Sequence, residues 1–253
     1  MTNTAGNRDF LAELVSAAEA NDVDRIRETF QAWEDAGATS PLKGKHNYPL
    51  IHFTPALNAA LKLGNIEAAG EFFDRGLPPA MDQFGSARLL GGSEPSQAAC
   101  MSKIPLVKYL LSKGADPNLN AKADSYSPLE CAALWGDSET LSLLLGRSPV
   151  EEIRCSSALL NAAQVGDIKK IDILLAARAD VNGIPDNWRL SQSALKDEKW
   201  GTALHVSVAH NQVACVAHLL GMGARKDVKN PAGLTPKEVA EKLGHKEVME
   251  LLK

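Results

Sequence analysis

The sequence lacks the features of proteins that bind nucleic acid or enter membranes. Its 253 residues carry 27 Lys and Arg against 31 Asp and Glu, so the net charge is −4 and there is no basic surplus for nucleic acid. Its apolar runs fall well short of the roughly 18 residues that a membrane span requires, and no basic amphipathic helix is evident. We therefore expect neither nucleic acid nor a membrane as a partner.

Cysteine is also scarce, and the four cysteines form no C-x-x-C pair. We predict that Cys100, Cys131, Cys155 and Cys215 are free thiols packed as small apolar side chains, as is usual in a reducing compartment. The N-terminus M-T-N-T-A-G-N-R-D-F lacks the charged and apolar regions of a signal peptide. These absences predict a location in the cytoplasm or the nucleus.

Motifs for catalysis, nucleotides and metals are missing as well. The chain holds no G-x-x-x-x-G-K-[ST], no H-E-x-x-H and no G-x-S-x-G, and its Cys and His residues lack the spacing of a zinc site. We therefore predict no cofactor and no metal, and no motif gives a reason to expect an enzyme.

What the chain does have is a repeated pattern of two short amphipathic helices. Ser127–Leu145 reads S-P-L-E-C-A-A-L-W-G-D-S-E-T-L-S-L-L-L, with Leu129 and Ala132 at helical spacing before Gly136 and a second apolar set after it. We predict a helix-turn-helix in which Gly136 takes a positive φ and Asp137 caps the second helix. Helices this short are marginal alone in water, so neighbouring copies must cover their apolar faces.

Copies of this unit recur along the chain. They start near residues 55, 93, 157, 202 and 235, and each keeps part of the pattern of small residues, hinge and paired large apolar residues. Residues 157–175, for example, repeat the Ala-Ala pair, the Gly-Asp hinge and the Leu-Leu pair. A degenerate, acidic helix pair at residues 8–36 is suited to cap the N-terminal end of the stack.

This pattern resembles the ankyrin repeat, which has a period near 33 residues and T-P-L-H-like starts. The turns between ankyrin repeats are similar to G-A-D-P-N at Gly114–Asn118 and A-D-V-N at Ala179–Asn182. The resemblance implies an all-α fold, an ankyrin-repeat solenoid of stacked helix-turn-helix units with finger-like loops. It also implies that residues 1–253 form a single ankyrin-repeat domain.

Three connections are longer than the ankyrin pattern requires: Gly37–Phe53, Gly76–Ser93 and Gly183–Gly201. In the ankyrin architecture the first helix of each repeat lines a concave groove and the connections project beside it, so insertions there enlarge the wall of the groove. These three insertions are either ordered walls of a recess or surface loops without fixed structure. The connection at Gly146–Cys155, by contrast, is trimmed.

The ankyrin register assigns particular side chains to the concave groove. We predict a site for an apolar anchor with a few amide groups; the tryptophans of the third insertion either close this site or only pack the insertion down. The predicted binding residues are Met101, Leu134, Trp135, Asn161, Gln164, Val165 and His210 in the groove, and Trp188, Arg189 and Trp200 in the insertion. His210 is also a candidate catalytic residue, as a general base paired with Asp186 or Asp197.

Two functions remain open on these residues. The resemblance implies a protein–protein interaction module, an adaptor, scaffold or inhibitor that binds its partner in the concave groove. The alternative is a protein that binds a small apolar molecule, or an unusual enzyme, with a pocket formed by the groove and the three insertions. We expect the first function, with another protein as the partner.

Overall fold

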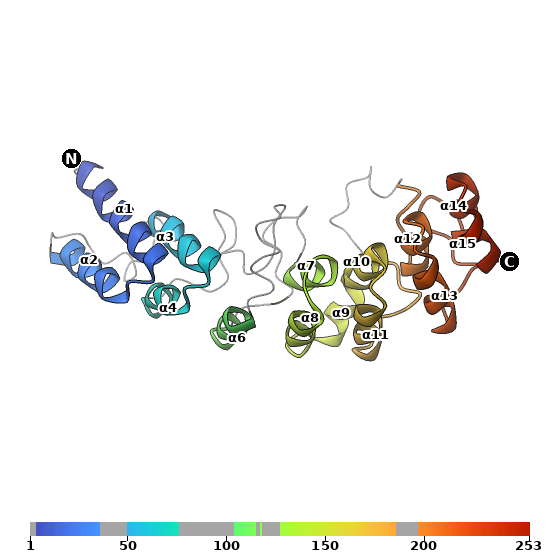
Figure 1. The fold of residues 1–253 in the computed structure, drawn as a ribbon, viewed down its shortest axis with the longest axis horizontal. Helices are drawn as coiled ribbons and strands as arrows, with labels where there is room; N and C mark the ends of the chain where they lie inside the picture. The colour runs from blue at the N-terminus through green and yellow to red at the C-terminus, as the bar shows by residue number, and fades with distance from the viewer. Residues whose placement is uncertain (1–3, 36–49, 76–103, 115–116, 118–126, 186–196) are drawn as a thin grey trace. The chain divides into compact units, whose positions relative to one another are not determined.

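The computed structural model describes residues 4–35, 50–75, 104–114, 117, 127–185 and 197–253 (Figure 1). Every regular element within these ranges is a helix, and none of these helices is long and apolar enough to cross a bilayer. The helices are α1 Thr4–Ala20, α2 Val23–Asp35, α3 Leu50–Leu63, α4 Ile66–Asp74, α6 Ile104–Ser112, α7 Pro128–Leu134, α8 Ser138–Leu145, α9 Val150–Cys155, α10 Ala158–Val165, α11 Ile168–Ala176, α12 Ala203–Ala209, α13 Val213–Gly221, α14 Pro236–Leu243 and α15 Lys246–Leu251.

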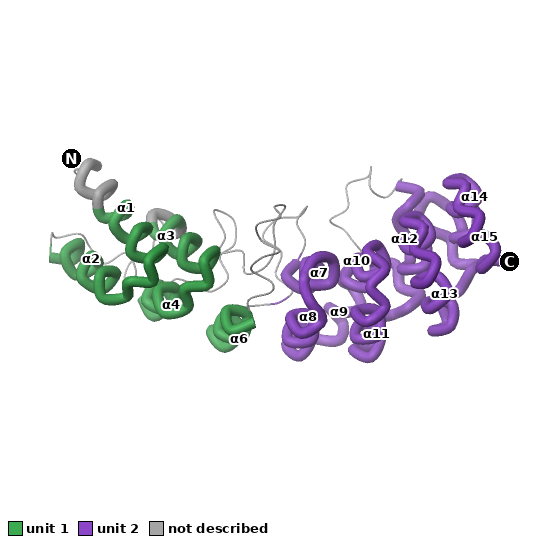
Figure 2. Tube along the Cα trace, viewed as in Figure 1, with its two compact units in different colours: residues 1–116 green, residues 117–253 purple. Residues whose placement is uncertain are grey.

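The chain divides into two compact units, unit 1 at Met1–Asp116 and unit 2 at Pro117–Lys253 (Figure 2). Each unit is described by itself below. The single domain expected over residues 1–253 stays a prediction.

Unit 1 consists of two helix pairs followed by α6. α1 packs on α3, and α2 packs on α4. Aromatic rings fill the space between the pairs: the ring centroid of Phe30 lies 5.2 Å from that of Phe53 and 5.7 Å from that of Phe72. Tyr109 of α6 lies 6.2 Å from Phe73 of α4, measured between ring centroids. The aromatic residues therefore supply much of the contact that joins these helices.

Two helices of unit 1 begin earlier than the sequence predicts. α1 begins at Thr4 rather than at residue 8. α3 begins at Leu50, so the end of the predicted insertion Gly37–Phe53 is helical and Pro55 lies inside the helix. The buried Phe53 explains this, because its ring packs against two aromatic rings of α2 and so favours helical backbone ahead of Pro55. That contact offsets the backbone hydrogen bond that proline cannot make.

Unit 2 holds four helix pairs, α7–α8, α10–α11, α12–α13 and α14–α15. The first helices form one row, in which α7 packs on α10, α10 on α12 and α12 on α14 (Figure 1). Among the second helices, α8 packs on α11 and α13 on α15. The trimmed connection Gly146–Cys155 contains the additional short helix α9, whose Ile153 is buried. This arrangement in two layers is the one that the repeated helix-turn-helix pattern predicts.

The periodic apolar residues of α7 and α8 lie in the core, as predicted. Leu129, Ala132 and Ala133 of α7, and Leu141 and Leu144 of α8, are each 0% exposed. The small alanine side chains let the first helices of adjacent repeats approach closely, while the leucines fill the space between the layers. The apolar pattern therefore places the repeats correctly.

The two residues of the predicted hinge behave differently. Asp137 caps α8 as predicted, since its Oδ1 accepts a hydrogen bond of 2.7 Å from a backbone N–H in the first turn. Gly136 lacks the predicted positive φ, although Gly166 and Gly244 at the same place both have φ of 73°. Glycine is needed at 136 for another reason: a Cβ there would lie 2.9 Å from the Cα of Ala132.

The cysteines follow the prediction only in part. Cys131 and Cys215 are buried free thiols, and burial raises the pKa of the Cys215 thiol to about 11. Cys155 is also a free thiol but is exposed, because it ends the short surface helix α9. The prediction of packed thiols is therefore wrong for Cys155, while Cys100 lies outside the described residues.

Replacing Leu144 by alanine tests the register of the stack. Leu144→Ala is expected to lower the free energy of unfolding by about 2–5 kcal/mol, because the side chain is fully buried and its removal leaves a cavity. Urea unfolding followed by circular dichroism measures the change. Leu143→Ala, at a half-buried position of the same helix, is the control and should cost less. An unchanged unfolding midpoint for Leu144→Ala would contradict the register.

Candidate functional site

Exposed apolar side chains recur at one position of the repeat, directly before the hinge. Six large apolar side chains are exposed in the described residues, and four of them take this position: Leu63 in unit 1, and Trp135, Val165 and Leu243 in unit 2. Trp135 is 47% exposed, Val165 42% and Leu243 38%. His210 is the exposed residue at the same position after α12. We call Trp135, Val165, His210 and Leu243 the hinge row.

The first helices are held in register at the ends that carry the hinge row. In each case a side chain at or just after the hinge of one repeat donates a hydrogen bond to a backbone carbonyl in the last turn of the preceding first helix. These bonds join Lys170 Nζ to the Ala133 carbonyl at 3.1 Å, Gln212 Nε2 to the Gln164 carbonyl at 3.0 Å and His245 Nδ1 to the Val208 carbonyl at 2.9 Å. The last carbonyls of a helix lack the partners of its interior, so bonds from the next repeat are made at these ends and fix the spacing of the row. The Val208 carbonyl also accepts the backbone N–H of Asn211 at 3.0 Å.

Glu130 forms a second contact between repeats, at the start of the first helices. Its Oε2 accepts the backbone N–H of Ser127 at 2.8 Å, which completes the capping box of α7. Its Oε1 accepts the backbone N–H of Ser157 in the next repeat at 2.9 Å. The Glu130 carbonyl accepts from Asn161 Nδ2 at 3.0 Å. This buried carboxylate therefore joins α7 to α10 without a cationic partner in either bond.

His205 makes the equivalent contact from α12. Its Nδ1 accepts the backbone N–H of Thr202 at 3.2 Å, and its Nε2 donates to the backbone carbonyl of Leu234 at 3.0 Å. These partners require a neutral ring with its proton on Nε2. Burial accordingly lowers the pKa of His205 below its ordinary value of 6.5. The contacts of His205 are therefore structural, and they hold its one ring proton on Nε2.

The end of the third insertion, Asp197–Trp200, is fixed beside α14, and we call it the insertion base. Asn230 Nδ2 donates to the backbone carbonyls of Glu198 and Trp200, both at 2.9 Å. Its Oδ1 accepts the backbone N–H of Leu234 at 2.9 Å. Asn230 is buried, so its amide group is fully used in joining the insertion base to the next repeat.

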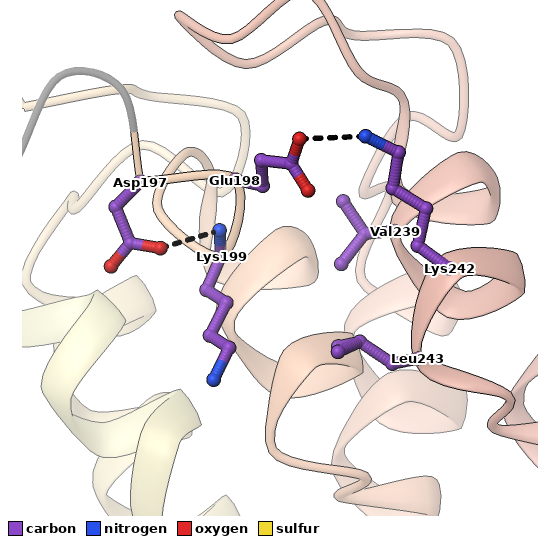
Figure 3. Close-up of a pocket in the computed structure, with 6 residues that line it drawn as sticks. All are labelled: Asp197, Glu198, Lys199, Val239, Lys242 and Leu243. Atoms are coloured by element: carbon purple, nitrogen blue, oxygen red, sulfur yellow. Dashed lines mark hydrogen bonds and ion pairs between the residues drawn. The ribbon is translucent and has the colours of Figure 1, made fainter.

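A cavity of about 240 Å³ lies between the insertion base and α14 (Figure 3). Its lining residues are Asp197, Glu198, Lys199, Val239, Lys242 and Leu243. Lys242 Nζ lies 2.6 Å from Glu198 Oε1, so one ion pair crosses the mouth of the cavity. Leu243 belongs to both the cavity and the hinge row, which makes the two features one continuous surface.

His210 lies close to Lys199 and Asp197 of the insertion base, and both charges affect the pKa of its ring. Partial burial and the nearby Lys199 lower the pKa of His210, while Asp197 acts in the opposite direction with a smaller effect. At any pH above about 6.5 the ring is therefore predominantly neutral. A neutral imidazole beside an ammonium group is suited to accept or donate a hydrogen bond at a binding surface.

The structure distributes the predicted binding residues over three environments. Trp135, Val165 and His210 are exposed in the hinge row, and Gln164 is half-buried beside it. Trp200 is half-buried in the insertion base. Leu134 and Asn161 are buried, at 8% and 5% exposure, because they pack within the stack and Asn161 bonds Glu130, so neither presents surface to a partner. The predicted residues Met101, Trp188 and Arg189 lie outside the described residues, as does Asp186.

Sequence reasoning named Asp197 and Trp200 of the insertion base but missed Lys199. Lys242 and Leu243 of α14 occupy the same repeat positions as Gln164 and Val165, so the repeat register places them in the groove, although they are not among the predicted binding residues. Lys199 has no counterpart in the repeat pattern, and only the folded insertion base brings it to His210. In the part of the chain that the structure covers, no group of three or more His, Cys, Asp or Glu residues is arranged to hold a metal ion.

Comparison with known families identifies the repeat. The family described as ankyrin repeats, in 3 copies, matches residues 96–185. The chain contains ankyrin repeats. The resemblance seen in the sequence is thereby confirmed, and so is the all-α fold class, since the ankyrin repeats of unit 2 stack as helix pairs in two layers.

A relative is similar to this chain over most of its length. The ankyrin repeat domain-containing protein SAT10 of Stachybotrys chartarum is 28% identical over 220 residues, which is 86% of this chain. The aligned part makes up 10% of the length of SAT10. The chain therefore corresponds to a small part of that relative.

The pH dependence of stability tests the protonation assigned to His205. Because burial lowers the pKa of His205 in the folded state, the unfolded state binds a proton at higher pH than the folded state does. The free energy of unfolding should therefore be highest above about pH 6.5 and fall as the pH drops below that value. Urea unfolding of wild-type and His205→Gln chains at pH 8.0 and 5.5 measures this. Equal pH dependence in the two chains would contradict the assignment.

Proposed function

We propose that this chain binds another protein through the hinge row of unit 2, as an adaptor, scaffold or inhibitor. The observation that carries the proposal is the exposure of Trp135, Val165 and Leu243 at the same position in three of the four repeats of unit 2. Ankyrin repeats generally mediate protein–protein interaction, and this chain contains them. The proposal adds the surface through which binding occurs.

The energetics favour the hinge row over the rest of unit 2. Fully burying a large apolar side chain contributes roughly 1.5–3 kcal/mol, and tryptophan is the residue most enriched among those that dominate interface energies. Nearly half of the Trp135 surface is exposed and can still be covered by a partner. A row of three exposed apolar side chains therefore offers surface whose burial would contribute to binding.

The backbone that carries the hinge row is also held in fixed register in the free chain. The carbonyls next to it are bonded to the following repeat by Lys170, Gln212 and His245. Side chains carried on the ends of helices in fixed register lose less conformational freedom on binding than side chains on loops do. This supports a surface that binds without refolding.

The alternative function, binding of a small apolar molecule, has less support. The cavity beside α14 measures about 240 Å³, below the roughly 300–1,000 Å³ of typical ligand pockets. A cavity of that size fits one side chain of a partner protein better than a separate ligand. The predicted catalytic role of His210 stays a prediction.

Site-specific crosslinking tests the proposed function. A photoreactive amino acid placed at Val165 in the full chain should crosslink the partner in cells, whereas the same residue at Ser142, exposed on α8, should not. The protein identified is then produced and its affinity measured by calorimetry. Trp135→Ala and Val165→Ser should each weaken binding by roughly tenfold or more, because each removes an apolar contact.

Ser142→Ala serves as the control variant and should bind like the wild type. Thermal unfolding of all variants separates binding from folding, and the hinge-row variants should unfold near the wild-type temperature. Partner affinity that is unchanged in both Trp135→Ala and Val165→Ser would contradict the proposal. A loss of stability equal to the loss of affinity would assign Trp135 to the core instead.

A further inference from the structure

The charges at the centre of the hinge row are not balanced. Lys199 of the insertion base and His210 of the hinge row lie together, between Val165 on the preceding repeat and Leu243 on the following one. Both Lys199 and His210 are exposed. The middle of this apolar row therefore presents one ammonium group and one imidazole to solvent.

The neighbouring carboxylates are already engaged or act weakly. Glu198 is paired with Lys242 at 2.6 Å. Asp197 Oδ1 accepts the backbone N–H of Lys199 at 3.0 Å, which closes the turn of the insertion base. Among the described residues, no carboxylate lies within ion-pair distance of the Lys199 ammonium group. Figure 3 shows the Lys199 side chain running away from the Glu198–Lys242 pair.

The charges that act on the His210 ring are consistent with a Lys199 ammonium group that has no ion pair among the described residues. Lys199 and Asp197 act on the ring in opposite directions, and the effect of Lys199 is the larger. α10, packed against α12, carries no charged residue. On α14, Lys242 is paired with Glu198 and Lys237 with Glu241, and the Glu238 carboxylate accepts the backbone N–H of Thr235. His218 on α13 is paired with Asp172. In the part of the chain that the structure describes, the charge with the larger effect on His210 is thus the positive one, although the whole chain has a net charge of −4.

We propose that the partner segment carries an Asp or Glu between two apolar residues, with its carboxylate bound by Lys199 and His210 and its apolar side chains on Val165 and Leu243. This proposal rests on the proposed function, because it names the kind of segment that the hinge row binds. A carboxylate is the complement of an unpaired ammonium flanked by an imidazole, and such a bond is roughly twice as strong as one between neutral groups.

The spacing of the repeats sets the spacing of the partner residues. Adjacent packed helices lie about 8–10 Å apart, so Val165 and Leu243, two repeats apart, are separated by roughly 20 Å. An extended chain covers about 3.3 Å per residue, which makes this distance about six residues. The acidic residue then falls about three residues from each apolar one.

Binding of this segment should take up a proton. A carboxylate placed beside His210 favours the charged imidazole, so the pKa of His210 is higher in the complex than in the free chain. Affinity should therefore rise as the pH falls from 8 to 6. A neutral residue at position 210 removes this dependence.

A displayed peptide library tests the proposal. Random 12-residue peptides on phage are selected against the full wild-type chain and, in parallel, against Lys199→Glu. Peptides from the wild-type selection should be enriched in Asp or Glu about three residues from apolar residues. The Lys199→Glu selection should replace that acid with Lys or Arg. Absence of acidic enrichment, or the same enrichment on both chains, overturns the proposal.

Affinities of one selected peptide separate the two proposals. Fluorescence anisotropy should show roughly tenfold weaker binding to Lys199→Gln than to wild type, and no pH dependence between 8 and 6 for His210→Gln. Lys169→Gln, at an exposed lysine on α11, is the matched control and should bind normally.

If Trp135→Ala or Val165→Ser weakens binding of the peptide and Lys199→Gln does not, the proposal of an acidic segment is overturned but binding through the hinge row is supported. Insensitivity to all these variants would overturn the proposed function as well. Light scattering could also show that the wild-type chain self-associates and that Lys199→Gln is monomeric. The segment bound by the hinge row would then be an acidic segment of a second copy of this chain, which would support the proposed chemistry.

Discussion

The structure of unit 2 depends on hydrogen bonds that cross from one repeat to the next. Each first helix has only seven or eight residues, too few to be stable alone, and its terminal backbone groups need partners. Glu130 and His205 supply them at the starts of the helices, and Lys170, Gln212 and His245 supply them at the ends. The repeats are thus held in register by polar contacts as well as by the buried leucines and alanines.

These contacts leave one position of each repeat partly exposed. It is the residue before the hinge, which in unit 2 is Trp135, Val165, His210 or Leu243. Exposed apolar side chains that recur at one position are typical of an interaction surface, and this recurrence is the basis of the proposed binding of another protein. The insertion base adds charge to the same surface, because Asn230 holds it beside α14.

The repeat pattern predicts most of the fold because burial in a stack is periodic. It places the core at Leu129, Ala132 and Leu144 correctly. It is wrong where a contact outside the repeat decides the outcome. Phe53 packs on α2, so that α3 begins within the predicted insertion, and Gly136 is required by the nearby Ala132 backbone instead of by a positive φ. For the surface, the same register finds Trp135 and Val165 but counts the buried Leu134 and Asn161 with them. Lys199 cannot be predicted, since its position depends on how the insertion folds.

The central claim is that the surface of unit 2, including the insertion base, is formed in the free protein. Hydrogen exchange of the intact chain without a partner tests it most directly, read at the backbone amides of Trp200, Asn230 and Leu234, whose N–H groups bond Asp197, Leu234 and Asn230. These amides are expected to exchange slowly, together with those of α12 and α14, because they open only when the neighbouring helices separate. Exchange at the rate of an unfolded peptide would contradict the claim, since Lys199 would then have no fixed place beside His210.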